Sequence, residues 1–154
     1  MPSASGKPPK RDADMTWSED EIYLVMERAH ALATQGLYAD AAQIFAGVVS
    51  LEPGNRYARE ALGSLLLILG EPVGALALAE EGLRAAPHDA ALHAVLAEAL
   101  LALHRVADAR EEVRWLEAHH PAPVATLELR LAASAPKIAG PQATLESRAP
   151  ITET

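Results

Sequence analysis

The 154-residue sequence contains no cysteine, and this absence removes several classes of protein at once. Disulfide-stapled folds, thiol catalysis and cysteine-based zinc sites are all excluded. Aromatic residues are also scarce, at 4% of the chain with a single Phe, although half of the residues are hydrophobic. A β-sandwich core needs β-branched and aromatic residues at alternating positions, whereas a core rich in Ala and Leu favours packed helices. We therefore expect an all-α fold.

Positive charge is in short supply too. The chain has 13 Lys and Arg against 21 Asp and Glu, a formal net charge of -8. Binding to phosphate backbones requires clustered basic residues that release counterions. A nucleic-acid partner is therefore not expected.

Long hydrophobic runs are missing as well. The longest aliphatic run, residues 65–69, is far too short to span a bilayer. Residues 1–15 begin with small and basic residues and contain no apolar stretch that would form the core of a signal peptide. We expect a cytoplasmic protein with no membrane partner.

The strongest positive signal is an internal period of 34 residues, which separates Pro53 from Pro87 and Pro87 from Pro121. Further columns keep the same spacing: Ala29, Gly63 and Ala97; Ala41, Ala75 and Ala109; and the pair Gly36 and Gly70. These residues resemble the tetratricopeptide repeat, a helix–turn–helix unit of this length. The resemblance covers three repeats, at residues 22–55, 56–89 and 90–123, and implies a right-handed α-solenoid of three helix pairs.

Each column has a physical reason within such a unit. Small residues in both helices let the two helices of a repeat approach closely. Glycine at the turn adopts the left-handed conformation that ends the first helix, and proline stops the second helix before the next repeat. The third repeat has His104 at the glycine position, so we expect a looser turn there.

The ends of the repeat block carry their own signals. Ser18 and Glu21 form a capping-box pattern, and Trp17 with Ile22 is placed for a hydrophobic staple, so the first helix should begin at Ser18. Residues 123–133 are predicted to form a helix that caps the last repeat. The folded domain should therefore span residues 17–133, between disordered tails at 1–16 and 134–154.

Three glycines fall inside second helices, at Gly47, Gly74 and Gly82, where each should lower the helix's stability. Gly82 occupies a position at which the repeat requires a small residue, so close packing would explain it. The other two have no such reason in the sequence.

No residue pattern predicts catalysis, a metal site or a cofactor. The six histidines contain no i, i+4 pair of the kind that binds zinc on a helix. His119 and His120 are expected in the last turn of a helix, where the helix dipole favours positive charge. Adjacent carboxylates such as Glu80 and Glu81 point in different directions and cannot act together as acid and base. We do not expect an enzyme.

The resemblance implies instead a groove for a protein or peptide client, lined by positions 2, 5, 9 and 12 of each repeat. These positions keep to one face of each first helix. The candidate groove residues are Tyr23, Met26, His30, Tyr57, Glu60, Ser64, Leu67, Ala94, Glu98 and Leu101. For Leu101, as for the neighbouring candidates Ala33 and Ala91, a role in packing is an equal alternative.

Tetratricopeptide adaptors that bind acidic C-terminal tails carry Lys and Asn at groove positions 5 and 9. Here position 5 holds Met26, Glu60 or Ala94, and position 9 lacks the Asn in every repeat. The groove has no carboxylate clamp and should favour an extended, partly hydrophobic peptide of neutral or basic charge.

Three repeats, a short cap and an acidic charge resemble the class II translocator chaperones of bacterial type III secretion, with the similarity also covering residues 97–101 and 107–109. This resemblance implies a secretion chaperone that holds a client before export and needs no cofactor. The alternative is a structural adaptor subunit of a secretion, pilus or envelope assembly. A homodimer is compatible with either.

Overall fold

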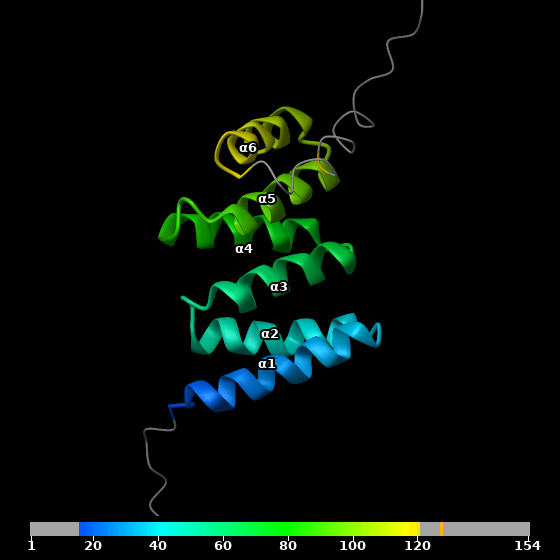
Figure 1. Cartoon of the computed structure of the whole chain (residues 1–154). Helices are drawn as coiled ribbons and strands as arrows, with labels where there is room; N and C mark the ends of the chain where they lie inside the picture. The colour runs from blue at the N-terminus through cyan, green and yellow to red at the C-terminus, as the bar shows by residue number, and fades with distance from the viewer. Residues whose placement is uncertain (1–15, 121–126, 128–154) are drawn as a thin grey trace, which may run out of the picture.

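The structure, a computed structural model, describes residues 16–120 and Leu127, and this part of the chain consists of helices and the loops between them. The helices are α1 (Glu19–Thr34), α2 (Tyr38–Leu51), α3 (Arg56–Ile68), α4 (Pro72–Ala85), α5 (Ala90–Ala102) and α6 (Val106–His119). Figure 1 shows them stacked in chain order from α1 at one end to α6 at the other. None of these helices is long and apolar enough to cross a membrane.

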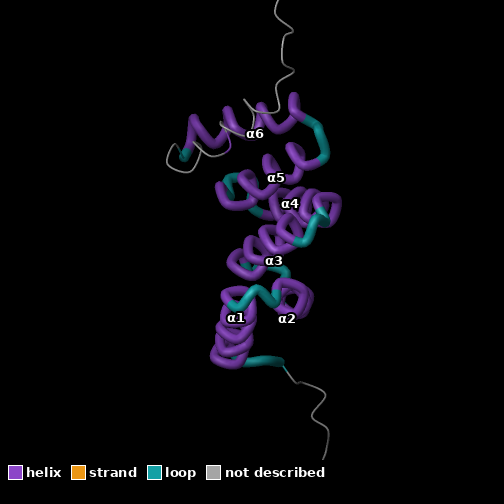
Figure 2. Tube along the Cα trace, turned by 90° about the vertical axis from the view of Figure 1, so that its right-hand side faces the viewer, coloured by secondary structure: helices purple, strands orange, loops and turns teal. Residues whose placement is uncertain are grey.

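The helices form antiparallel pairs that stack into a solenoid, as the period predicts. Each helix packs against the next one in the chain, and α3 also packs against α5. Figure 2 shows the pair α1 and α2 side by side at one end and α6 at the other. The predicted all-α solenoid of helix pairs is confirmed. The predicted tails, and the capping helix over residues 123–133 apart from Leu127, lie outside the described residues.

Polar side chains begin the first helix of each repeat. The Ser18 hydroxyl accepts a hydrogen bond from the Glu21 N–H, and the Ser18 N–H donates to the Glu21 carboxylate at 2.8 Å, so the predicted capping box is present. These bonds from the Ser18 N–H and hydroxyl lower the pKa of Glu21. Asn55 caps α3 and Asp89 caps α5 in the same way, by accepting bonds from backbone N–H groups.

The three turns inside the repeats share one backbone conformation. Gly36 and Gly70 have φ angles of 80° and 77°, and His104 adopts the same left-handed region at 61°. The His104 N–H donates to the Leu101 carbonyl at 3.1 Å, the same bond and length that Gly70 makes to Leu67. The expectation of a looser third turn is therefore wrong, because the hydrogen bonds hold His104 in a conformation that costs a non-glycine residue some strain.

The small-residue columns mark where helices approach most closely. Ala29 and Ala97, like Ala41, Ala75 and Ala109, have no exposed surface at all. A Cβ atom added at Gly63 would lie 2.7 Å from Cγ1 of Val95, which is shorter than a van der Waals contact. A Cβ at Gly82 would lie 2.5 Å from Cδ1 of Leu92, so the predicted packing reason for this glycine is confirmed.

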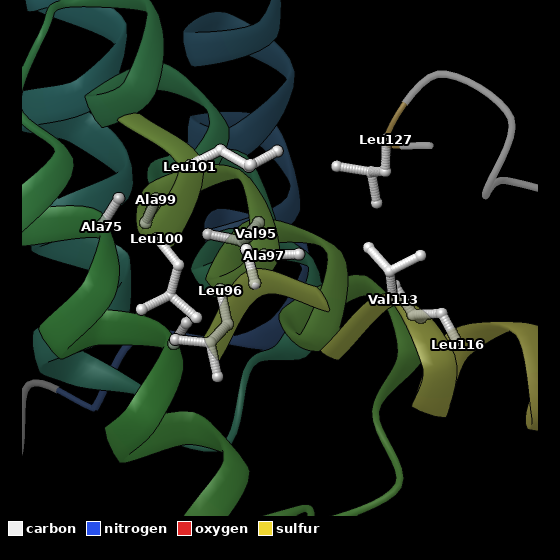
Figure 3. Close-up of a cluster of buried hydrophobic side chains, with 12 residues drawn as sticks. Ala75, Val95, Leu96, Ala97, Ala99, Leu100, Leu101, Val113, Leu116 and Leu127 are labelled. Atoms are coloured by element: carbon white, nitrogen blue, oxygen red, sulfur yellow. The ribbon is translucent and has the colours of Figure 1, made fainter. Parts of the chain in front are cut away.

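Two clusters of buried side chains form the core, one at each end of the solenoid. The N-terminal cluster lies among α1, α2 and α3 and includes Phe45, which is 1% exposed. The C-terminal cluster joins α4, α5 and α6 with Leu127 (Figure 3). Leu127 is buried in this cluster, so the chain beyond α6 contributes to the core.

An ion pair connects the start of α3 to the residue that caps α5. Arg56 Nε donates to a carboxylate oxygen of Asp89 at 2.6 Å, and the Asp89 side chain is almost completely buried while that of Arg56 is exposed. Burial alone would raise the pKa of Asp89, but the hydrogen bonds from Arg56 and from the N–H groups of Leu92 and Ala91, with the positive charge of Arg56, outweigh it and lower this pKa below its usual value. The ionised carboxylate is therefore the form that the folded state prefers.

Two glycine substitutions should have opposite effects on stability. An alanine Cβ at Gly47 meets no atom within 4 Å, so Gly47→Ala should raise the free energy of unfolding by about 0.5–1 kcal/mol through better helix propensity. Gly63→Ala should lower it by about 1–3 kcal/mol, because the stiff Val95 side chain must move. Urea titrations followed by circular dichroism measure both. A loss of stability in Gly47→Ala would reveal a backbone requirement at that position.

Asp89 should make stability depend on pH in the acid range. Its lowered pKa means that its contribution is fully present above the unfolded-state value and is lost as the pH falls through the folded-state value. Asp89→Asn keeps a helix-capping side chain but loses the charge, and should cost about 1 kcal/mol at pH 7. The difference from the wild type should shrink as the pH falls below 4. Asp108→Asn, at a half-exposed pair with Arg105, is the control and should have a smaller effect.

Candidate functional site

Two adjoining hollows lie along the face formed by the first helices of the repeats. The larger, of about 680 Å³, is an open hollow between α3 and α5. Its lining consists of Glu60, Ser64, Leu67, Ile68, Ala90, Ala91, Ala94, Val95, Glu98 and Ala102. Small residues on α5 leave this space open, because an alanine extends only one carbon from the helix.

The smaller hollow, of about 260 Å³, lies among α1, α2 and α3. It is lined by His30, Ala33, Phe45, Tyr57, Glu60, Ala61, Ser64 and Leu65. Glu60 and Ser64 border both hollows, so the two together form one continuous surface, which we call the groove.

Tyr57 stands at the N-terminal part of the groove and is 49% exposed. Its ring meets Phe45 edge to face, with centroids 6.1 Å apart and planes at 67°. Its hydroxyl oxygen lies 3.4 Å from Nδ1 of His30 on the neighbouring repeat. These contacts hold a large amphipathic ring in place while leaving half of it accessible to a ligand.

The charged residues that line the groove are acidic. Glu60 lies at the junction of the two hollows and Glu98 borders the larger one, and neither lining includes a Lys or Arg. The rest of the surface is formed mainly by aliphatic side chains and Tyr57. The groove therefore combines apolar surface with negative charge.

Most of the predicted groove residues lie at these hollows. The predicted residues that line them are His30, Tyr57, Glu60, Ser64, Leu67, Ala94 and Glu98, together with Ala33 and Ala91. Tyr23 lies on α1, is 59% exposed and borders neither hollow. Met26 packs against the N-terminal cluster.

Leu101 does not face the groove. Its side chain is 6% exposed and belongs to the C-terminal cluster, where Figure 3 shows it among the other core residues. The prediction of a groove position is wrong for this residue, and the packing alternative is correct. Its counterpart Leu67, 34 residues earlier, is only partly buried and lines the larger hollow.

Several lining residues were not among the predicted groove positions. Ile68, 59% exposed, extends the groove by one turn beyond Ser64 on the same face of α3. The i, i+4 spacing of these two residues is a signal from which it can be predicted. Phe45 reaches the groove from α2, and nothing in the pattern of the first helices indicates it.

His93 and His119 serve the packing of α5 and α6. His93 Nδ1 lies 2.6 Å from a Glu112 carboxylate oxygen, its Nε2 lies 2.9 Å from the Pro87 carbonyl, and its ring stacks on Trp115 at 3.6 Å. His119 Nδ1 lies 2.8 Å from the Trp115 carbonyl in the last turn of α6, as its predicted capping role requires. Among the described residues no group of His, Asp and Glu is placed to hold a metal ion.

A family model described as "Tetratricopeptide repeat" matches residues 66–131. This match and the stacked helix pairs support the assignment of the chain as a tetratricopeptide repeat protein. This match begins near the end of α3, and the 34-residue columns extend the same spacing back through the helix pair α1 and α2. No curated protein matches the sequence.

Solved structures share the fold at low sequence identity, and two of them are TPR domains by their titles. The first TPR domain of human RPAP3 has a TM-score of 0.64 at 14% identity, covering 73% of this chain and 94% of that one. The first TPR of Spaghetti (RPAP3) bound to the HSP90 peptide SRMEEVD has a TM-score of 0.66 at 14% identity, with coverages of 77% and 98%. MamA from Desulfovibrio magneticus has a TM-score of 0.61 at 22% identity, with coverages of 76% and 71%.

Proposed function

We propose that this protein is a protein–protein interaction module that binds an extended, partly hydrophobic peptide in the groove. The observation that carries the proposal is the continuous hollow surface along α1, α3 and α5, on which Tyr57 is half exposed and held by Phe45. A rigid aromatic ring with accessible surface is a common anchor in protein interfaces, because little side-chain entropy is lost when it is buried.

The charge of the groove sets the class of peptide. The similar structure of Spaghetti holds a peptide that ends in acidic residues, EEVD. The present groove is bordered by Glu60 and Glu98, which would repel such an end. Complementarity therefore favours a peptide with apolar anchors and neutral or basic residues between them.

The finer role that we propose is that of a cytoplasmic secretion chaperone. Its support is the resemblance in size and plan to the translocator chaperones, together with a groove of apolar and acidic side chains. Such a protein holds an aggregation-prone segment by binding alone and releases it before export.

Tyr57→Ala tests the use of the groove. Removing this anchor should weaken binding by about 2 kcal/mol or more, which is roughly a thirtyfold rise in Kd. Titration calorimetry with a client segment captured from the native host gives the measurement, and circular dichroism should show unchanged helix content.

Tyr38→Ala is the matched control, because Tyr38 is also a partly exposed tyrosine, at the start of α2, and borders neither hollow. Its Kd should stay within about twofold of the wild type. Equal weakening by the two substitutions would show that the client does not use the groove.

Exchange distinguishes a chaperone from the adaptor subunit that is the alternative. A chaperone–client complex should release labelled client when unlabelled client is added in excess, because release is part of the function. A stable subunit should instead remain with its assembly through purification and exchange little label over hours. Release on this scale supports the chaperone role, and retention would contradict it.

A further inference from the structure

One position between the two helices of a repeat is filled differently in each repeat. Residues 25, 59 and 93 of the first helices are separated by 34, and so are residues 47, 81 and 115 of the second helices. In a repeat structure these residues occupy equivalent places. Their side chains can therefore be compared directly.

In the second repeat the place is filled by Arg59, which is 5% exposed. Its guanidinium donates to the Pro53 carbonyl at 2.9 Å and to the Leu78 carbonyl at 3.3 Å, and lies 3.9 Å from a carboxylate oxygen of Glu81. Its stem passes close over Gly82. A flat group on a long stem thus closes the gap between α3 and α4.

In the third repeat the same place is filled by His93 and Trp115, whose rings stack at 3.6 Å. The His93 side chain is 12% exposed and is fixed by Glu112. Here too flat side chains close the gap, now between α5 and α6.

In the first repeat none of the described residues fills the equivalent place. Val25 is short and Gly47 has no side chain, and a Cβ added at Gly47 would meet no atom within 4 Å. A hollow of about 180 Å³ remains, which we call the niche. It is lined by Trp17, Ile22, Val25, Gln43, Ile44, Gly47, Val48 and Leu51.

The size and lining of the niche indicate what it accepts. Except for Gln43, its side chains are hydrophobic, and an apolar protein cavity of about 150 Å³ takes up a benzene molecule. The niche is therefore large enough for one aromatic ring. Trp17 at its edge is 46% exposed, so it offers a face on which an entering ring can stack.

Charge selects among possible occupants. The first turn of α1, which starts beside Trp17, carries Glu19, Asp20 and Glu21 in succession. A second copy of this chain would bring a like-charged surface, and the whole chain has a net charge of -8. A segment with basic residues is attracted to the same place.

From the vacant repeat position, its volume and the acidic first turn of α1 that follows Trp17, we infer that the niche is a second docking site, which receives one aromatic side chain from a partner segment with basic flanks. It shares no lining residue with the groove. The inference does not depend on the peptide-binding role of the groove.

The probe is a synthetic peptide with one Phe flanked by lysines, and the readout is the indole N–H signal of Trp17 in two-dimensional NMR of the full chain. The chain has two Trp, and Trp17→Phe assigns the signal. The peptide should shift the Trp17 signal in a saturable way and leave Trp115 unmoved. Replacing Phe by Ala should weaken binding by about tenfold or more, and replacing the lysines by glutamates should also weaken it.

Gly47→Leu places a side chain in the niche and should weaken binding of the Phe peptide by about tenfold. Gly74→Leu is the matched control, a glycine inside the second helix of the next repeat, and should bind like the wild type. If Gly47→Leu lowers the helix content, the variant Val25→Phe, which fills the same space from α1, is used in place of Gly47→Leu.

Three results would overturn the inference. In the first, the Phe and Ala peptides would shift the Trp17 signal equally. In the second, neither peptide would shift it. In the third, dilution of the protein alone would move this signal. The last result would identify a second copy of the chain as the occupant. A Tyr57→Ala variant should bind the probe normally, which separates the niche from the groove.

Discussion

The fold depends on the close approach of helices at the small-residue columns. Where Gly63 faces Val95, even one added carbon would lie 2.7 Å from a neighbouring methyl carbon. The small residues in the second helix of each repeat are completely buried: Ala41, Ala75 and Ala109. Each helix packs on the next, so the position of each helix pair fixes the position of the following pair. These contacts therefore place α1, α3 and α5 on one face.

The groove exists because the same small residues that allow packing also leave surface uncovered. Ala90, Ala91, Ala94 and Ala102 on α5 fill little space between their helix and α3, so a hollow of about 680 Å³ stays open. Larger side chains there would close it by packing against Leu67 or Ile68. Tyr57 is the exposed aromatic ring at the smaller hollow, where the other aromatic residue, Phe45, is buried.

The sequence predicted what is set locally and repeats with the period. The positions of the turn at His104 and of the capping box at Ser18 could be predicted, because both depend on neighbouring backbone groups. The sequence did not predict that the His104 turn would have the same hydrogen bond as the glycine turns. The predicted groove positions on α3 came from the resemblance to the tetratricopeptide repeat, and their helical spacing is consistent with one face. Leu101 did not, because its burial depends on the C-terminal cluster, which includes Leu127 from beyond the repeats and has no periodic counterpart. Phe45 was missed because it reaches the groove from a second helix.

The niche could not be predicted from the sequence for a different reason. An empty space between side chains can be recognised only once the positions of the surrounding residues are known. Val25 and Gly47 are unremarkable residues 22 positions apart, and Gly47 alone reads as a weak point in a helix. Arg59 and His93 show that the equivalent place requires a long or flat side chain to be closed. Among the described residues the second and third repeats fill this place with their own side chains and the first does not, and this difference is the basis for inferring an aromatic occupant of the niche.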